Sequence, residues 1–138
     1  MSTYFKNKTL ATFIAAVSGG LGLHRFYVCG KKDLFGWLHV SSLILCGLLW
    51  LANREMQGFF IIGPMILSVL ASFIEALVIG LTPDDKWDAR HNATGQRQSD
   101  SNWPLAVILV LTLGIGATAL IASMARLFDL LFTGGAYG

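Results

Sequence analysis

The chain has 138 residues, of which 54% are apolar and only 13% are charged, and its mean hydropathy is +0.62. A soluble globular domain has about 25% charged residues, so this composition excludes that class and predicts an all-α integral membrane protein. The formal net charge of +2 is small, and the basic residues lie at the ends of apolar runs, which argues against a nucleic-acid partner.

The first apolar run covers residues 9–23 and follows Lys6 and Lys8. It is short for a membrane span, but we predict that it is the first of four transmembrane helices in a small bundle. Lysines, a compact apolar run and small residues after it also fit a secretory signal peptide. We reject that alternative because cleavage would separate this helix from the motif that follows it.

The next segment is a glycine-rich, positively charged elbow (residues 19–33), which contains the sequence Gly-Gly-Leu-Gly-Leu-His-Arg-Phe-Tyr-Val-Cys-Gly. Its basic residues and backbone N–H groups predict contact with a lipid phosphate. The alternative is that Arg25 caps the first helix while its aromatic neighbours seat the elbow in the membrane interface. The residues singled out for lipid contact are His24, Arg25, Phe26, Tyr27, Gly30, Lys31 and Lys32.

Two further spans follow, over residues 34–52 and 59–81. Trp37 and Trp50 fit the two aromatic belts of a membrane helix. In the third span Pro64 lies in the second turn, where we expect only a gentle bend. Together residues 1–81 form the first region of the chain.

An intramembrane polar face is predicted on the third span, because Ser68, Ser72 and Glu75 are spaced at i, i+4 and i+7. An ionisable group within a span is costly and normally faces protein or water. The functional interpretation of this face is a proton or ion relay. The structural alternative is a protonated or hydrogen-bonded carboxyl group that fixes the packing of the helices.

Residues 82–102 form a hydrophilic connection of mixed charge, in which residues 85–90 are expected to form a short interfacial helix anchored by Trp87. Residues 103–138 contain the fourth span, over about 105–128, and a short glycine-rich tail. Cys29 and Cys46 lie in different environments, so no disulfide is expected.

Small residues recur at helical spacing on the first and fourth spans, where they would let another helix approach closely. We therefore predict a homo-oligomer, or binding to a larger membrane partner. Chance clustering of common small residues is the alternative for the first of these stripes. The residues concerned are Ala11, Ala15, Gly19, Gly114, Thr118 and Ala122.

The elbow resembles the motif of TM2 domain membrane proteins, in which a glycine-rich helix end and His-Arg-Phe-Tyr or Asp-Arg-Phe-Tyr precede a second helix. The resemblance covers about residues 8–52 and implies a membrane protein with no settled biochemical activity. The acidic position of the family matches either Asn53, at the expected distance, or Glu75, about one helix later. The second alignment resembles longer bacterial relatives, which implies a bacterial inner membrane.

No sequence pattern indicates an enzyme, and no cofactor is expected. His24, His39, His91 and the cysteines lack the short spacing of a metal site, so no metal is expected. One class of function is a non-enzymatic interaction or assembly module in contact with membrane lipids. The other is a small channel, transporter or lipid-handling protein that uses Glu75 or the elbow. A single intramembrane acid, Glu75, with no second ionisable partner within the spans favours the first class, since relays need a chain of groups.

Orientation follows from the distribution of basic residues. With four spans, the elbow and the connection would share one side with six Lys and Arg residues, whereas both termini and the 53–58 turn would share the other with four. The sequence therefore predicts a cytoplasmic elbow and connection, with both termini outside. Lys6 and Lys8, which precede the first helix, favour the reverse.

Overall fold

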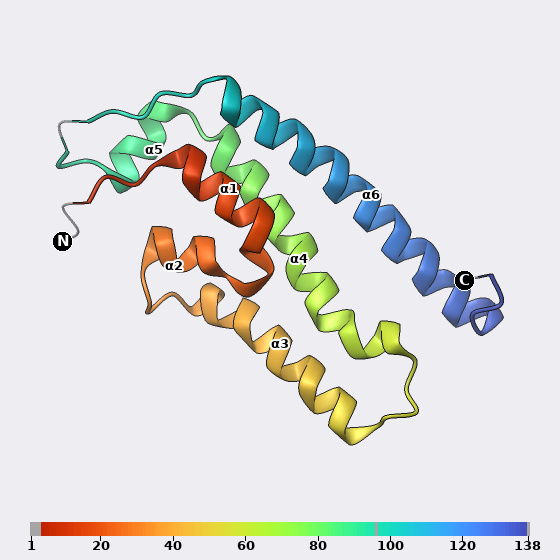
Figure 1. Cartoon of the computed structure of the whole chain (residues 1–138). Coiled ribbons are helices and arrows are strands. Elements are labelled where there is room, and N and C mark those ends of the chain that lie inside the picture. Colours follow the sequence, from red (N-terminus) through yellow and green to blue (C-terminus); the bar gives the residue numbers. More distant parts are fainter. Residues whose placement is uncertain (1–3, 96, 138) are drawn as a thin grey trace.

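The computed structural model describes residues 4–95 and 97–137, and within them every regular element is a helix (Figure 1). Because no β-strand is present among these residues, their regular backbone hydrogen bonds are all made within helices. This is the arrangement that a chain embedded in a membrane requires. The elements in chain order are α1 (Lys8–Ser18), the 3₁₀ helix η1 (Gly19–Leu21), α2 (Leu23–Cys29), α3 (Leu34–Ala52), α4 (Gly58–Leu81), α5 (Asp84–His91) and α6 (Trp103–Thr133).

Three of these helices, α3, α4 and α6, are long and apolar enough to cross a membrane. The bounds of α3 are those predicted, α4 begins one residue early, and α6 is longer than the predicted 105–128. Asp33 caps the start of α3, because its side chain accepts a hydrogen bond from the Gly36 N–H. Gly134, with a φ of 69°, ends α6. The structure thus has three helices of membrane-spanning length and composition among the described residues.

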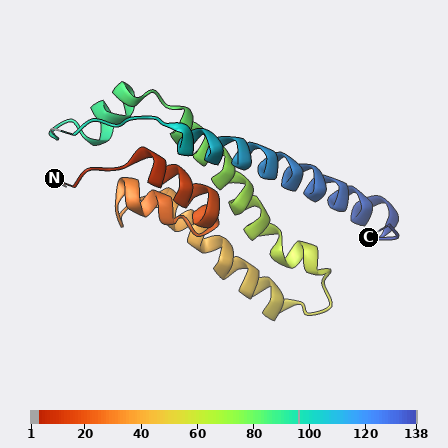
Figure 2. The ribbon, with the colours of Figure 1, turned by 45° about the horizontal axis from the view of Figure 1, so that its top comes forward.

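The fourth predicted span is not confirmed, because residues 9–23 do not form one long helix. α1 has 11 residues, which at 1.5 Å per residue is about 16 Å, half of a hydrocarbon core of about 30 Å. After η1 the chain reverses at Gly22, whose φ is 74°, and α2 returns beside α1 (Figures 1 and 2). The run was too short to span, and its glycines allow the reversal. We call α1, η1 and α2 the N-terminal hairpin.

Residues 4–7, which precede α1, consequently lie at the same end of the molecule as α5 (Figure 1). The backbone N–H of Lys6 donates to Asn92 Oδ1 at 2.9 Å, and Lys8 Nζ donates to the Thr82 carbonyl at 2.8 Å. The expectation that the N-terminus lies with the 53–58 turn was therefore wrong, because it assumed a complete first span. We call residues 4–8, 30–33, 82–95 and 97–102 the basic end. The 53–57 turn and the C-terminus lie at the opposite end (Figure 2).

The helix α4 lies in the middle of the structure and contacts α1, α3 and α6. Ala11 and Ala15 of α1 are fully buried, and a Cβ atom at Gly19 would lie only 2.4 Å from Ser72 Cβ of α4. The first small-residue stripe is thus covered within the chain. Most large apolar side chains remain exposed, as expected where lipid is the solvent.

The connection contains the predicted short helix as α5, but Trp87 is buried against the N-terminal segment and does not point outward as an interface anchor would. The indole of Trp87 is buried, and its Nε1 donates to the Lys6 carbonyl at 3.0 Å. Asp88 accepts hydrogen bonds from the N–H and the hydroxyl of Ser99. These contacts fold the connection against the N-terminal segment and place α5 beside the end of α4.

Candidate functional site

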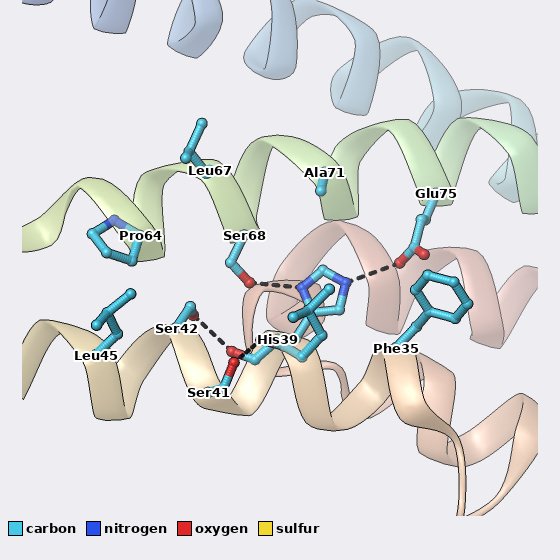
Figure 3. Close-up of a pocket in the computed structure, with 11 residues that line it drawn as sticks. Phe35, His39, Ser41, Ser42, Leu45, Pro64, Leu67, Ser68, Ala71 and Glu75 are labelled. Carbon is cyan, nitrogen blue, oxygen red and sulfur yellow. Dashed lines mark hydrogen bonds and ion pairs between the residues drawn. The ribbon is translucent and has the colours of Figure 1, made fainter.

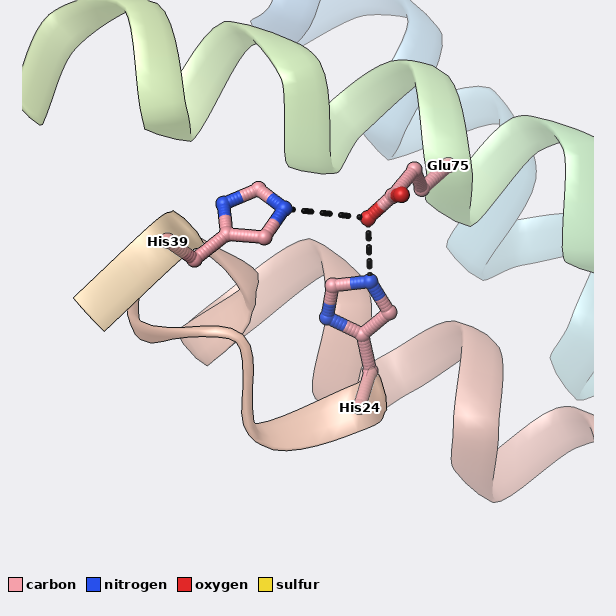
Figure 4. A group of neighbouring side chains, drawn as sticks. All are labelled: His24, His39 and Glu75. Atoms are coloured by element: carbon pink, nitrogen blue, oxygen red, sulfur yellow. Dashed lines mark hydrogen bonds and ion pairs between the residues drawn. The ribbon is translucent and has the colours of Figure 1, made fainter. Parts of the chain in front are cut away.

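The site is built around Glu75, which α4 directs toward the N-terminal hairpin and α3 (Figure 4). Ser68 and Ser72, on the same helix, are buried, and the Glu75 side chain is 26% exposed. Glu75 lies six residues before the end of α4, which is about 9 Å from that end at 1.5 Å per residue. The carboxyl group is therefore inside the apolar part of the protein but close to the basic end.

Two histidines from separate elements meet one oxygen of Glu75 (Figure 4). His24 Nε2 of α2 lies 2.5 Å from Glu75 Oε2, and His39 Nε2 of α3 lies 3.2 Å from the same atom. Both rings are buried, and they contact each other edge to face, with centroids 5.7 Å apart. The expectation that Glu75 lacks a second ionisable partner within the spans was wrong, because His39 is one.

The other oxygen of Glu75 is held by Arg25, whose Nη1 donates to Oε1 at 3.1 Å. Arg25 also forms a two-pronged ion pair with Asp33, through Nε at 2.9 Å and Nη2 at 3.2 Å. The hydrogen bond from Arg25 lowers the pKa of Asp33, and the same contact raises the pKa of Arg25. Both groups are therefore charged at neutral pH. Arg25 thus bridges the cap of α3 to the intramembrane carboxyl group.

The tautomer of His39 follows from its second ring nitrogen. Ser68 Oγ donates to the Gly20 carbonyl at 2.7 Å and lies 2.6 Å from His39 Nδ1 (Figure 3). A serine hydroxyl has one hydrogen, and the carbonyl, which can only accept, takes it. His39 Nδ1 must then donate to Ser68. In a neutral ring this leaves His39 Nε2 with a lone pair directed at Glu75.

The tautomer of His24 is also defined, because its Nδ1 is buried without a hydrogen-bond partner among the described residues. An N–H group left unpaired there, together with a lone pair facing a carboxylate 2.5 Å away, would be doubly unfavourable. His24 therefore keeps its proton on Nε2 and donates it to Glu75. The close approach of the N-terminal hairpin to α4 at Gly19 fixes the ring, since a Cβ there would lie 3.2 Å from His24 Nδ1.

One additional proton belongs between His39 and Glu75. Without it, the lone pair of His39 Nε2 would face a carboxylate oxygen at 3.2 Å, which is repulsive. A proton held by either atom turns the contact into a hydrogen bond. The proton also changes the net charge of the cluster, by which we mean His24, Arg25, Asp33, His39 and Glu75. With both histidines neutral, the charges of Arg25, Asp33 and Glu75 sum to one negative charge, and one added proton makes the cluster neutral. Neutrality is strongly favoured inside a membrane.

The three side chains also offer ligand atoms for a metal ion, since one atom of each lies within 4.8 Å of the others. The sequence expectation of no metal site was based on spacing along the chain, which did not reveal this cluster. Two features oppose a divalent ion: the Arg25 guanidinium on the other carboxylate oxygen, and a His24 ring that would have to move its proton to an unpartnered Nδ1. The donor set therefore fits a proton better.

Cavities flank the cluster on two sides. A groove of about 440 Å³ between α3 and α4 is lined by His39, Ser68 and Glu75, and by apolar residues toward Pro64 (Figure 3). A second pocket, of about 510 Å³, lies between α2, α4 and α5 and reaches His24 and Arg25. The cluster thus separates a pocket at the basic end from a groove that runs deeper along α4.

The other sequence-selected residues lie outside the cluster. Tyr27 accepts a hydrogen bond from the Asn7 N–H at 3.0 Å, and Phe26 packs edge to face on Trp37. Lys31 and Lys32 are exposed, and a Cβ at Gly30 would meet nothing within 4 Å. The stripe of Gly114, Thr118 and Ala122 is exposed on α6.

The sequence interpretation omitted His39 and Asp33 from the site. A histidine within an apolar run is costly for the same reason as Glu75, and that signal could have identified His39. Comparisons of the chain with family models, with curated proteins and with solved structures found no match. The chemistry of the site is therefore inferred from its own geometry.

Proposed function

We propose that the protein is a small proton-transfer protein of the membrane, in the channel or transporter class. The observation that supports this function is the contact of His39 Nε2 with Glu75 Oε2 at 3.2 Å, made while His39 Nδ1 is committed to Ser68. That contact defines a site for one exchangeable proton. His24, on the other side of the same oxygen, supplies a second ring through which a proton can pass.

The proposed route connects the two cavities. A proton from water at the basic end reaches His24 through the pocket between α2, α4 and α5. His24 accepts this proton at Nδ1 as its Nε2 proton passes to Glu75 Oε2 at 2.5 Å, and Glu75 passes a proton to His39 Nε2 at 3.2 Å, which releases it to the groove between α3 and α4. Rotation of the His24 ring then returns its remaining proton to the Nε2 position. Arg25 stays protonated and holds the carboxyl group in place. Each transfer leaves the acceptor able to pass on a proton, as a relay requires.

A liposome assay tests this function. The purified protein is reconstituted with a pH-sensitive dye inside, and a pH gradient is applied with a potassium ionophore to prevent charge build-up. We expect faster collapse of the gradient than in empty liposomes. Glu75→Gln and His39→Asn should each reduce the flux at least tenfold, because each removes an exchangeable site. Ser41→Ala is the matched control, since Ser41 lines the same groove but bonds only to the Leu38 carbonyl.

Two further measurements make the result decisive. Infrared difference spectra between acidic and alkaline pH should show a protonated carboxyl band that Glu75→Gln removes. A band without flux would mean that the cluster binds a proton but does not transfer it, which would refute the proposed function. Flux that zinc blocks at stoichiometric concentration, with loss of that block in His39→Asn, would instead support metal binding by the cluster.

An assembly module is the second candidate, and one observation favours it. Gly114, Thr118 and Ala122 form an exposed small-residue face on α6, and nothing lies within 4 Å of a Cβ at Gly114. Such faces allow close helix association in lipid, so a homo-oligomer or a larger membrane partner is proposed for it. The assembly and proton-transfer functions are compatible, because this face is separate from the cluster.

The proposed setting is a bacterial inner membrane, from the resemblance of the elbow to TM2 domains. Seven of the ten Lys and Arg residues lie at the basic end, and only Arg54 and Arg126 lie toward the other. The positive-inside rule therefore supports a cytoplasmic basic end. Because residues 4–8 lie at that end, the excess of Lys and Arg there is seven against two, whereas the four-span arrangement gave six against four. The seven are Lys6, Lys8, Lys31, Lys32, Lys86, Arg90 and Arg97.

A further inference from the structure

The pocket between α2, α4 and α5 has two kinds of wall. One wall is apolar and includes Val28, Val78 and Ile79, and the buried face of Trp87. The other is basic and includes the side chains of Lys86, Arg90 and His91, and no Asp or Glu residue lines the pocket. Its volume is about 510 Å³. A pocket of this composition at the end of a spanning helix is amphipathic in the way that a lipid is.

The acidic residues of α5 do not neutralise this basic wall. Asp84 forms an ion pair with Lys8 and accepts hydrogen bonds from Ser101, whereas Asp88 is held by Ser99 and Asn92. Both carboxylates therefore bind groups of the connection and of α1, not the basic side chains of the pocket. Within residues 4–95 and 97–137, neither Lys86 nor Arg90 has a carboxylate within 4 Å, and the other described ion pairs involve different residues. Those pairs are formed by His24, Arg25, His39 and Arg126.

The positive charges reinforce one another. Lys86 and Arg90 are spaced at i and i+4, so they are neighbours on one face of α5 and repel each other. Lys6 Nζ donates to the Val28 carbonyl at 2.5 Å, which adds a third cation at the edge of the pocket. Burial lowers the pKa of His91, and Lys6 and Arg90 lower it further. The pocket thus holds a positive potential that the protein itself leaves uncompensated.

We propose that this pocket binds the headgroup of an anionic phospholipid, with its phosphate between Lys86 and Arg90. A lipid fits better than a soluble phosphate because apolar side chains continue the pocket toward the membrane. Val78 and Leu81, at the last turns of α4, are 62% and 69% exposed and offer a surface for an acyl chain. The site differs from the elbow contact predicted from sequence, because its phosphate ligands come from α5.

The test uses the full-length protein in nanodiscs of phosphatidylcholine, to which phosphatidylglycerol is added in increasing mole fraction. Binding is followed by the NMR signal of the His91 ring, whose pKa should rise when an anion neutralises its surroundings. Lys6 and Arg90 act on His91 electrostatically and the Trp87 ring packs on it, while Lys86 and Arg25 line the same pocket, so an anion among these cations should raise the pKa of His91. We expect saturable binding of one lipid.

Paired variants separate a specific site from general surface attraction. Lys86→Gln with Arg90→Gln should weaken binding about thirtyfold, because each basic residue contributes about fivefold. Lys31→Gln with Lys32→Gln removes the same charge from exposed residues outside the pocket and should change binding less than about threefold. Lys86→Gln alone provides a milder variant if the double variant does not fold, and should weaken binding about fivefold.

Three results would overturn the proposal. Equal losses in the two charge-matched pairs would mean diffuse attraction to the surface. If inorganic phosphate occupied the pocket as readily as phosphatidylglycerol does, the pocket would be a site for a soluble anion rather than for a lipid. A His91 pKa that does not respond to phosphatidylglycerol would mean that the pocket takes no anion. None of these outcomes depends on proton flux, so the inference stands or falls separately from the proposed function.

Discussion

Lys8 and Asp84 form an ion pair that joins the first turn of α1 to the first turn of α5. Lys8 is 4% exposed and also donates to the Thr82 carbonyl. This contact holds the start of α1 beside the end of α4. The N-terminal hairpin therefore begins and ends at the same end of the structure. The ion pair thus holds the first apolar run, which is too short to span and reverses at Gly22, at the end of the structure where it begins.

The first prediction is an asymmetry between the two partners. Asp84→Asn leaves the buried ammonium group of Lys8 without a charged partner and should destabilise the protein by about 3 kcal/mol. Lys8→Met removes the buried charge itself and should cost about 1 kcal/mol or less. Thermal unfolding in detergent measures both changes, and equal losses would contradict the buried-charge explanation.

The same pair predicts the acid sensitivity of the fold. Burial opposes ionisation of Asp84, but hydrogen bonds from Lys8 and Ser101 outweigh it and lower its pKa below the usual value of 3.8. A carboxyl group whose pKa is lower in the folded state stabilises the fold above its unfolded pKa. That contribution is lost as the pH falls below about 4. The loss at low pH should therefore be smaller in Asp84→Asn than in the parent.

The second prediction concerns Glu75. Glu75→Gln is neutral and its amide can donate to His39, so we expect expression and helix packing close to those of the parent. Glu75→Leu removes every contact with His24, Arg25 and His39, and should destabilise by about 3 kcal/mol or more. Unfolding in detergent compares the two. A misfolded Gln variant beside a stable Leu variant would exclude a packing role for the carboxyl group.

Some of this arrangement could be predicted from sequence, because apolar length and tryptophan positions define α3, α4 and α6. The polar face of α4 could also be predicted, since its spacing is local. The meeting of His24, His39 and Glu75 could not, because it depends on how three elements pack. The N-terminal hairpin was missed for a local reason: residues 9–23 were taken as a span despite their short length, and Gly22 was not recognised as a point of reversal.

The third prediction tests that reversal. Gly22 has a φ of 74°, and a Cβ there would lie 2.6 Å from the Gly36 carbonyl oxygen of α3. Gly22→Ala should therefore destabilise by about 2 kcal/mol or more, from both backbone strain and the clash. Gly114→Ala is the control, because Gly114 lies in a helix and nothing lies within 4 Å of a Cβ there. If both substitutions had the same effect in thermal unfolding, the reversal would not need a glycine.

The fourth prediction distinguishes the two small-residue stripes. Ala15 is fully buried within the chain, so Ala15→Ile should overpack the contact with α4 and destabilise by about 1 to 3 kcal/mol. Thr118 is exposed on α6, so Thr118→Ile should leave the monomer stable but reduce crosslinked dimers in membranes. Crosslinks that persist unchanged in Thr118→Ile, or a parent protein that is strictly monomeric, would contradict assembly through this face.

The last prediction is the orientation of the chain in the membrane. The basic end contains the N-terminal segment, residues 30–33 of the elbow and the connection. Seven Lys and Arg residues lie there. Each basic residue near an anionic inner leaflet gains about 1 kcal/mol, so the basic end is expected in the cytoplasm and the C-terminus outside. Cys29 is exposed beside this end. In intact cells of a Cys46→Ser variant, a membrane-impermeant thiol reagent should leave Cys29 unlabelled until the membrane is opened.

Two further cysteines separate this arrangement from the four-span one. In a Cys29→Ser, Cys46→Ser background, cysteine at Tyr4 should be protected in intact cells, because the N-terminus shares the basic end. Cysteine at Tyr137 should be labelled, because α6 carries the C-terminus to the other end of the molecule (Figure 1). Four spans would expose both positions to the reagent. Labelling of both Tyr4→Cys and Tyr137→Cys in intact cells would therefore contradict the hairpin, whereas labelling of Cys29 and of Tyr4→Cys with protection of Tyr137→Cys would reverse the orientation.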